Sequence, residues 1–184
     1  KNLGCKENKI VVIPNNIEKE LFKTKNGYKE NNILFFGRIH PIKNIECLIK
    51  AIKILSNKKL QLNGNIVGPA EDKYLKKLKL MVRRFGLENK IQFGKQINST
   101  KEKTAMYSKA KILVLPSRWE AFGIVIIEAM AAGLTVISSK TNGGTEIIED
   151  NKTGYLFEID NEKELAEKIE LAIKKPINAR EKAK

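Results

Sequence analysis

The chain alternates between short, strongly apolar runs and longer helical segments, and this alternation restricts its fold more than any other feature. Short apolar runs bounded by turn residues are typical of buried strands, and strands separated by helices form right-handed βαβ units. The predicted strands are residues 10–13, 33–36, 61–67, 90–93, 112–115, 135–138 and 155–157. The predicted helices are residues 43–56, 71–85, 99–109, 123–132, 144–149 and 161–175. The sequence therefore predicts an α/β fold with a doubly wound parallel sheet of about six strands, covered by helices on both faces.

In sheets of this kind, ligands bind beyond the carboxyl ends of the strands. Four segments that follow predicted strands carry the residues suited to ligand chemistry: 37–43, 94–98, 117–123 and 141–145. Because the carboxyl ends of parallel strands meet at one edge of the sheet, we expect these four loops to lie close together.

The segment Glu120–Glu128 reads E-A-F-G-I-V-I-I-E and places two carboxylates eight positions apart. Glu120 is expected in the loop that leaves a buried strand, and Glu128 about two turns into the following helix. Eight residues of helical rise would separate them by about 12 Å. That is more than the roughly 5–9.5 Å between the carboxyl groups of a glycosidase. The pair instead suits one extended ligand with hydroxyl groups at both ends and an anion between them, as in a sugar joined through a diphosphate to a ribose.

Glu128 lies in an apolar helix, so its carboxylate is either at a water-facing edge or held by a partner. The alanines that follow it indicate a closely packed helix, which favours a role as acceptor for ribose hydroxyls over a surface position. The turn formed by Ala121, Phe122, Gly123 and Ile124 can offer backbone amides to sugar hydroxyls or phosphate oxygens. The dipole of the helix that begins there would assist.

The loop after the strand at 33–36 contains Gly37, Arg38 and Lys43. Gly37 permits a sharp exit from the strand. Arg38 can make a planar fork to a diphosphate, and Lys43 can place a point charge beside it. In so basic a chain such residues can be ordinary surface groups, and their position at a strand's carboxyl end is what favours ligand binding.

Two further features carry a weaker signal. Ile97 follows the end of a predicted strand and can offer its backbone to a nucleobase. Gly143 and Gly144 can form a second anion-binding nest, or a turn that needs positive φ, and the sequence leaves both explanations open.

The formal net charge of +14 admits three kinds of partner: nucleic acid, an anionic membrane surface and an anionic small ligand. The helix predicted at 71–85 carries its basic residues opposite its apolar face: Lys73, Lys76, Lys77, Lys79, Arg83 and Arg84. A solvated face is the ordinary explanation, and attraction to a membrane surface is the alternative. Nucleic acid ranks below both, because no aromatic or glycine-rich recognition element accompanies the charge.

Cys5 and Cys47 are isolated, and His40 is the only histidine. A zinc site or a histidine-based triad within the chain is therefore not expected, and no metal ligands are predicted. Two isolated cysteines that stay reduced favour the cytoplasm. No apolar run approaches the roughly 18 residues of a membrane span, although attachment to the inner membrane face remains open.

Four motifs carry a resemblance to a known family. They are V-V-I-P-N-N-I-E at 11–18, F-G-R-I-H-P-I-K-N at 36–44, P-S-R-W-E-A-F-G-I-V-I-I-E-A-M-A-A-G at 116–133 and G-G-T-E-I-I-E-D-N-K-T-G-Y-L-F at 143–157. With them, the chain resembles the C-terminal, donor-binding domain of the family 4 glycosyltransferases of the GT-B fold. The resemblance covers roughly residues 10 to 175, and the segment between the two glutamates with its flanks is its most specific part.

The resemblance implies a Rossmann-like domain over residues 10–176, preceded at 1–9 by the tail of an interdomain linker. Residues 177–184 would begin a truncated C-terminal helical region. It also implies hexosyl transfer with retention of configuration from a UDP-, GDP- or ADP-sugar, without cofactor or metal. Arg38 and Lys43 would hold the diphosphate and Glu128 the ribose. Glu120 and the amides of Phe122, Gly123 and Ile124 would hold the sugar.

The resemblance has departures and alternatives. Asn44 and Asn16 stand where the family has glycine, and asparagine tolerates left-handed backbone better than most residues. Thr145 stands where proline is common. We expect the family's N-terminal acceptor-binding domain to lie outside this sequence, and the chain to be inactive or nearly so by itself. The alternatives are a non-catalytic nucleotide-sugar-binding module and, less favoured, a basic nucleic-acid-binding domain.

Overall fold

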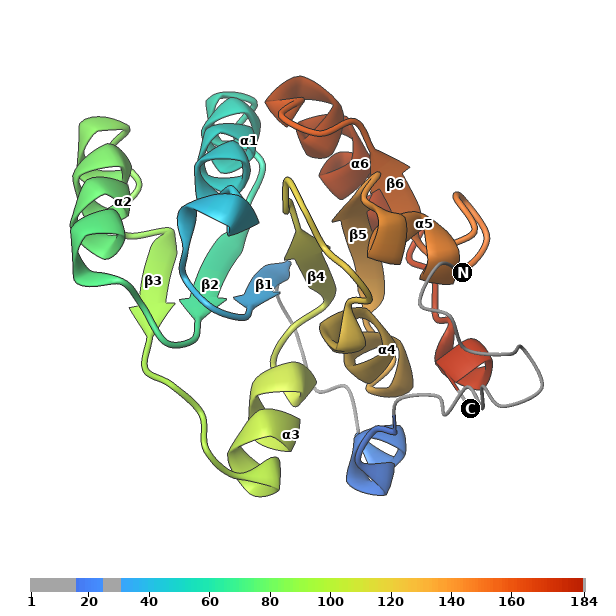
Figure 1. Cartoon of the computed structure of the whole chain (residues 1–184). Coiled ribbons are helices and arrows are strands. Elements are labelled where there is room, and N and C mark those ends of the chain that lie inside the picture. Colours follow the sequence, from blue (N-terminus) through green and yellow to red (C-terminus); the bar gives the residue numbers. More distant parts are fainter. Residues whose placement is uncertain (1–15, 25–30, 184) are drawn as a thin grey trace, which may run out of the picture.

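The computed structural model describes residues 16–24 and 31–183, which form one sheet with helices packed on both sides (Figure 1). The strands are β1 (Asn32–Phe36), β2 (Asn63–Val67), β3 (Ile91–Gly94), β4 (Ile112–Leu115), β5 (Thr135–Ser139) and β6 (Tyr155–Phe157). The helices are α1 (Ile45–Asn57), α2 (Asp72–Arg84), α3 (Thr100–Ser108), α4 (Ile124–Ala131), α5 (Asn142–Ile147) and α6 (Glu162–Lys174). Three short 3-10 helices are η2 (Lys19–Lys23), η3 (Pro41–Lys43) and η4 (Arg180–Ala183).

The six described strands are all parallel and lie in the order β3-β2-β1-β4-β5-β6. This is the doubly wound order of Rossmann-like sheets, and it confirms the predicted fold class. The chain winds outward from β1 in one direction and from β4 in the other. The order therefore reverses between β1 and β4, where such sheets bind their ligands.

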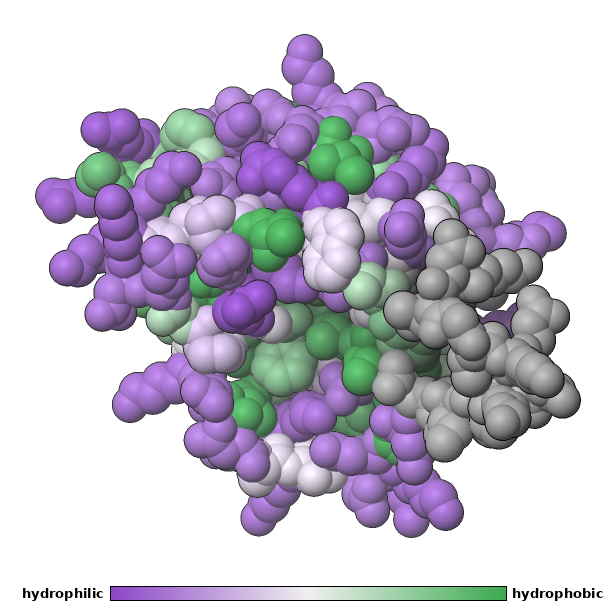
Figure 2. Space-filling view, in the orientation of Figure 1, coloured by the Kyte–Doolittle hydropathy of each residue, from purple (hydrophilic) through white to green (hydrophobic). Residues whose placement is uncertain are grey.

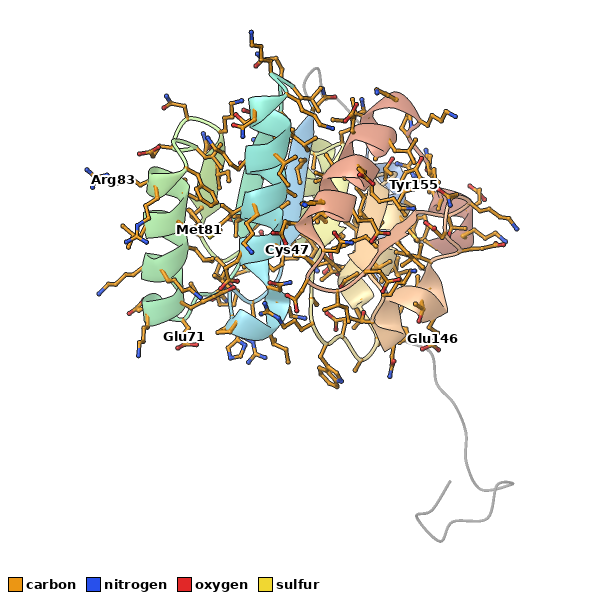
Figure 3. All side chains as sticks on the ribbon, turned by 90° about the horizontal axis from the view of Figure 1, so that it is seen from above. Cys47, Glu71, Met81, Arg83, Glu146 and Tyr155 are labelled. Atoms are coloured by element: carbon orange, nitrogen blue, oxygen red, sulfur yellow. The ribbon has the colours of Figure 1, made fainter. Side chains whose placement is uncertain are left out.

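Two helical layers cover the sheet. Helix α1 packs between α2 and α6 in one layer, and Figure 3 shows these three helices side by side. Helices α3 and α4 lie in the layer on the other face, together with η2 and η4 (Figure 1). Every residue of β4 and β5 is buried, as expected for central parallel strands covered on both faces.

The helix and strand boundaries agree with the prediction to within two residues where the structure describes them. The predicted strand at 10–13 lies outside the described residues. Helix α1 begins at Ile45 and not at residue 43, because Asn44 adopts a left-handed conformation with φ 51°. Helix α5 begins at Asn142, before the predicted start, because the Thr141 hydroxyl accepts a hydrogen bond from Gly144 N and caps the first turn.

Candidate functional site

The loops after β1 and β4 lie next to each other because these two strands pair directly, Ile33 with Ile112 and Leu34 with Leu113. Gly37 leaves β1 with φ +149°, which confirms the predicted sharp exit. Gly68 leaves β2 with φ +147°, and a Cβ atom there would lie 2.0 Å from the Gly37 carbonyl oxygen. Glycine is thus required at Gly68 by close backbone contact, a requirement that the sequence did not reveal.

Lys43 and Glu120 join the two loops. The Lys43 ammonium lies 2.5 Å from Oε2 of Glu120, and each side chain is about one-fifth exposed. The other oxygen of Glu120 accepts no hydrogen bond from the described residues. The structure therefore brings together two of the predicted site residues, which come from segments 77 positions apart.

Arg38 follows Gly37 at the carboxyl end of β1, and its side chain is exposed. Within residues 16–24 and 31–183 it has no ion pair or hydrogen bond. The structure places Arg38 in the same loop as Lys43, but only Lys43 contacts the Glu120 loop. The guanidinium is a positive charge without a partner among the described residues, beside the point where the strand order reverses.

The N-terminus of α4 is formed by Ala121, Phe122, Gly123 and Ile124. Gly123 takes the cap position with φ +83°, and no side chain of the described residues caps the helix. None of these four backbone amides donates to an acceptor in the part of the chain that the structure describes. An anion at this position would receive several N–H donors and the favourable end of the helix dipole.

Gly143 and Gly144 serve close packing. Both lie within α5, and neither has positive φ. A Cβ atom on Gly143 would lie 2.6 Å from the Phe122 carbonyl oxygen, and one on Gly144 would lie 2.6 Å from that of Ser139. Their amides are also occupied, because Gly143 N donates to the Glu120 carbonyl and Gly144 N to Thr141. Both explanations drawn from the sequence, the anion nest and the positive-φ turn, are wrong.

Glu128 is buried, with 6 % of its surface exposed, and both of its oxygens have protein donors. Lys103 Nζ lies 2.9 Å from Oε1, and the Tyr107 hydroxyl donates to Oε2 at 3.0 Å. Lys103 also reaches Glu18 at 3.3 Å. Of the two sequence-based alternatives, the surface position is excluded, and Glu128 is held by partners.

The estimated separation of the two glutamates rested on a wrong premise. Helix α4 begins at Ile124, so residues 120–123 contribute no helical rise. Glu128 is the fifth residue of the helix, little more than one turn from its start. The figure of about 12 Å for continuous helix does not apply to this segment.

The environment of Glu128 fixes the charges of its partners. Burial raises the pKa of Tyr107 well above its usual value, and the Glu128 carboxylate raises it further, so the hydroxyl keeps its proton. Partial burial lowers the pKa of Lys103, but the hydrogen bonds and charges of Glu128 and Glu18 outweigh this effect, and the net pKa is raised. Lys103 and Tyr107 are one turn apart on α3, and only their i, i+4 spacing in the predicted helix could have pointed to them.

An ion pair between Arg118 and Asp160, called the brace below, links the β1 and β4 loops on the side of α1 and α6. The Arg118 guanidinium forms two contacts with the Asp160 carboxylate, at 2.7 and 3.2 Å, and donates to the Pro41 carbonyl at 3.1 Å. The Arg118 amide donates to the Ile42 carbonyl, and the Asn44 side chain donates to Asp160 at 3.0 Å. The loops that carry Lys43 and Glu120 are therefore also joined behind the site.

The remaining predicted features contribute less. Ile97 is half-buried against the core, and its proposed contact with a base stays a prediction. The described residues contain no cluster of His, Cys, Asp or Glu placed to bind a metal ion. A groove of about 700 Å³ between η2 and α3, lined by Lys23 and Thr104 among others, contains none of the predicted site residues. The assignment of the site therefore rests on the geometry at the strand reversal and not on cavity volume.

Comparisons with known proteins identify the family and the fold. The family described as glycosyl transferases group 1 matches residues 16–184. The chain is 34 % identical over 166 residues to a Campylobacter jejuni GalNAc-alpha-(1->4)-GalNAc-alpha-(1->3)-diNAcBac-PP-undecaprenol alpha-1,4-N-acetyl-D-galactosaminyltransferase, covering 90 % of this chain and 45 % of the relative.

Two solved structures show the same fold. HepE from Anabaena, crystallised with UDP-glucose, has a TM-score of 0.75 at 28 % identity, covering 84 % of this chain and 44 % of HepE. The C-terminal domain of the group 1 glycosyltransferase LpcC from Francisella tularensis has a TM-score of 0.73 at 28 % identity, covering 93 % of this chain and 89 % of that domain. The chain spans less than half the length of the first relatives that it matches. It belongs to the group 1 glycosyltransferases and has the Rossmann-like fold of their C-terminal, GT-B domain.

Proposed function

We propose that this chain is the donor-binding domain of a retaining, family 4 hexosyltransferase that uses a UDP-, GDP- or ADP-sugar. The observation that carries the proposal is the Lys43–Glu120 ion pair at the strand reversal, next to amides at the N-terminus of α4 that no described residue occupies. Positive charge, N–H donors and a carboxylate acceptor are what a diphosphate joined to a sugar requires.

The diphosphate would lie between the β1 loop and the N-terminus of α4. Arg38, which has no described partner, would bind it through its planar fork, and Lys43 would add a second positive charge. Glu120 would accept hydroxyl groups of the sugar through the oxygen that no described residue occupies. The amides of Ala121, Phe122, Gly123 and Ile124 would donate to phosphate or sugar oxygens.

The nucleoside would extend toward α3. An ionised carboxylate has about four acceptor positions, and Lys103 and Tyr107 use one on each oxygen of Glu128. Acceptor capacity therefore remains for the ribose hydroxyls, while the two partners fix the orientation of the carboxylate. The backbone at Ile97 would contact the base, and Gly37 would let the backbone come close to the ligand.

The comparisons supply the first ligand to test and not the specificity. HepE was crystallised with UDP-glucose, which makes UDP and UDP-glucose the natural probes. Transfer would proceed without a bound metal, through charge supplied by Arg38, Lys43 and α4. A separate domain would bind the acceptor, and we place the protein in the cytoplasm. None of the helices in the described residues is long and apolar enough to cross a membrane.

Titration calorimetry of this chain with UDP tests the proposal. A related C-terminal domain was solved by itself, which supports work with the isolated chain. Arg38→Ala should weaken UDP binding by about tenfold or more, because a hydrogen bond to a charged group contributes about 1.5–3 kcal/mol. Arg38→Lys should not restore binding, since the fork is lost. Arg84→Ala, which removes an exposed arginine on α2, is the matched control. Equal UDP affinity in all variants would show that Arg38 does not bind the diphosphate.

A further inference from the structure

Helix α2 carries an unusual share of the positive charge of the chain. Its 13 residues include six basic side chains and one acidic one, a net charge of +5 out of +14 for the whole chain. Helix α6 has the same length and lies in the same layer, but has four acidic and three basic side chains. The charge excess is therefore not spread evenly over the helices, as a uniform lysine-rich composition would make it.

Five of the six basic residues of α2 point away from the protein. Tyr74, Leu78 and Val82 form the buried stripe of the helix. Lys77 turns toward α1 and pairs with Glu46 at 2.9 Å. The other five are exposed and have no ion pair within residues 16–24 and 31–183; they are Lys73, Lys76, Lys79, Arg83 and Arg84. Figure 3 shows Arg83 projecting from the outer side of α2, and Figure 2 shows hydrophilic side chains over this edge.

An apolar side chain lies in the middle of this basic surface. Leu80 is 50 % exposed, one of few large apolar side chains that the fold leaves half in water. Since consecutive helical residues are about 100° apart, Leu80 lies about opposite Leu78 on the helix. Lys76, four positions before Leu80, and Arg83, three positions after it, lie on the same side of the helix. The outer face of α2 thus combines cations that have no ion pair with any described residue and one exposed aliphatic group.

We propose that the outer face of α2, defined by Lys73, Lys76, Lys79, Leu80, Arg83 and Arg84, binds the surface of an anionic lipid bilayer. A helix lying on a bilayer places an apolar side chain at the level of the acyl chains and basic side chains among anionic headgroups. Long lysine and arginine side chains can bury their stems and keep their charges at the headgroup level.

A nucleic acid would use the same charges but fits the surface less well. Single-stranded RNA binds through aromatic side chains that stack on its bases, and the aromatic residue on α2, Tyr74, is buried. A half-exposed leucine adds nothing to phosphate binding, whereas it can enter a bilayer. RNA is therefore the competing outcome in the experiment below.

Helix α2 begins beside the loop that carries Arg38, because the Glu71 amide donates to the Ile39 carbonyl. The substitutions tested below start more than one turn further along the helix, at Lys76. Helix α2 lies in the layer with α1 and α6, at the β3 edge of the sheet, whereas the partners of Glu128 come from α3 on the opposite face (Figure 1). The membrane proposal does not depend on the proposed function. UDP binding tests the donor site, and vesicle binding tests the outer face of α2.

Co-sedimentation of this chain with lipid vesicles tests the proposal. The vesicles contain phosphatidylcholine alone or with about 30 mol % phosphatidylglycerol, since the attraction requires anionic lipid. The test variant carries Lys76→Glu, Lys79→Glu and Arg83→Glu. The control variant has the same change in net charge elsewhere, through Lys59→Glu, Lys109→Glu and Lys163→Glu. All three control lysines are exposed, lie outside α2 and have no ion pair in the described part of the chain.

We expect binding to the anionic vesicles alone, weakened by added salt. The α2 variant should bind more than about 100-fold less tightly, because each basic side chain near an anionic surface contributes roughly fivefold. The control should lose less than about tenfold, and Leu80→Ser should lose several-fold. UDP binding and circular dichroism should stay unchanged, showing that the variants are folded.

Three results would overturn the proposal. The wild-type chain could fail to bind anionic vesicles. The α2 and control variants could lose binding equally, which would show a response to net charge alone. The chain could bind mixed-sequence RNA through α2 at physiological salt and leave anionic vesicles unbound, which would assign the surface to nucleic acid.

Discussion

The two glutamates of the segment 120–128 are each paired with a lysine, but their surroundings differ. Glu120 lies in a loop, is 19 % exposed, and uses one oxygen to bind Lys43. Glu128 lies in a helix, has a side chain only 8 % exposed, and has both oxygens bound, by Lys103 and Tyr107. One carboxylate can change partner when a ligand arrives, whereas the other has its orientation fixed beforehand.

This difference matches two tasks. A carboxylate beside the reacting sugar must exchange its lysine partner for ligand hydroxyls. Partial exposure keeps the free energy of breaking the ion pair small. A carboxylate that holds the ribose gains from being oriented before binding, because less freedom is then lost on binding. The comparison therefore predicts that Glu128 contributes to folding and nucleotide binding, and Glu120 mainly to recognition of the sugar.

The largest combined effect on folding and nucleotide binding is expected for Glu128→Gln. The substitution leaves the Lys103 charge without its buried partner, and breaking a buried pair costs about 3–5 kcal/mol. Because Lys103 is 21 % exposed, we expect a smaller loss of unfolding free energy, about 2 kcal/mol, in urea titrations. Calorimetry should show weaker binding of both UDP and UDP-glucose.

Glu120→Gln is the matched variant for this prediction. It should change the unfolding free energy by less than about 1 kcal/mol and weaken UDP-glucose binding while leaving UDP binding unchanged. In the full-length protein it should also slow transfer, because charge develops at the anomeric carbon near that carboxylate. Equal losses for both ligands in both variants would show that the two glutamates merely support the local fold.

Gly143→Ala should disturb the Glu120 loop and leave Glu128 in place. The new Cβ atom would overlap the Phe122 backbone, and forcing an extra methyl group into a packed site costs about 1–3 kcal/mol. UDP-glucose binding should fall with the loss of stability. Gly94→Ala is the control, because its new Cβ meets only the Val67 side chain, at 3.0 Å. An equal loss of unfolding free energy in both variants would argue against a specific role for the contact between Gly143 and the Phe122 backbone.

Tyr107→Phe tests the fixed carboxylate alone. Removing the hydroxyl leaves Oε2 of Glu128 without its donor and should cost about 1–2 kcal/mol at pH 8. The pKa of Tyr107 is raised in the folded state above the usual tyrosine value of 10. Its contribution to the free energy of unfolding is therefore complete below pH 10 and falls above that pH, because the phenol ionises in the unfolded state. Urea titrations at pH 8 and pH 11 should therefore show a smaller difference between wild type and variant at pH 11. A constant difference would contradict the assigned shift.

The smallest effect is expected for Arg118→Met, which removes the brace behind the Glu120 loop. Both members of the Arg118–Asp160 pair are about half exposed, so the loss of stability should be at most about 1 kcal/mol. UDP-glucose affinity should fall slightly more than UDP affinity, since the brace holds the Lys43 and Glu120 loops together. Asp160→Asn should have a similar effect, and loss of UDP binding in either variant would place Arg118 in the binding site itself.

Much of the fold followed from local patterns. The strands and helices could be predicted because buried parallel strands are short apolar runs and their connecting helices have apolar faces. The location of Lys43 and Glu120 at one edge followed from their positions after strands. Gly37, Gly123 and Gly133 stand where the backbone takes positive φ, a property that sequence context can indicate.

The partners of Glu128 could not be predicted in this way. Lys103 and Tyr107 are 25 and 21 positions away in the chain, and their helix resembles any short polar helix. The same holds for Gly68 and Gly143, whose neighbours are backbone atoms of other segments. Such contacts depend on how helices and loops pack, which local propensity does not encode.

The sequence by itself determined the α/β class, the edge of the sheet that carries the polar loops, and the residues at that edge that suit an anion and hydroxyl groups. It could do so because strand periodicity and glycine positions are local properties. The tertiary structure decided which carboxylate is exchangeable and which is fixed, and which basic residues remain unpaired. Burial and ion pairing depend on side chains that come together only when the sheet order β3-β2-β1-β4-β5-β6 is formed.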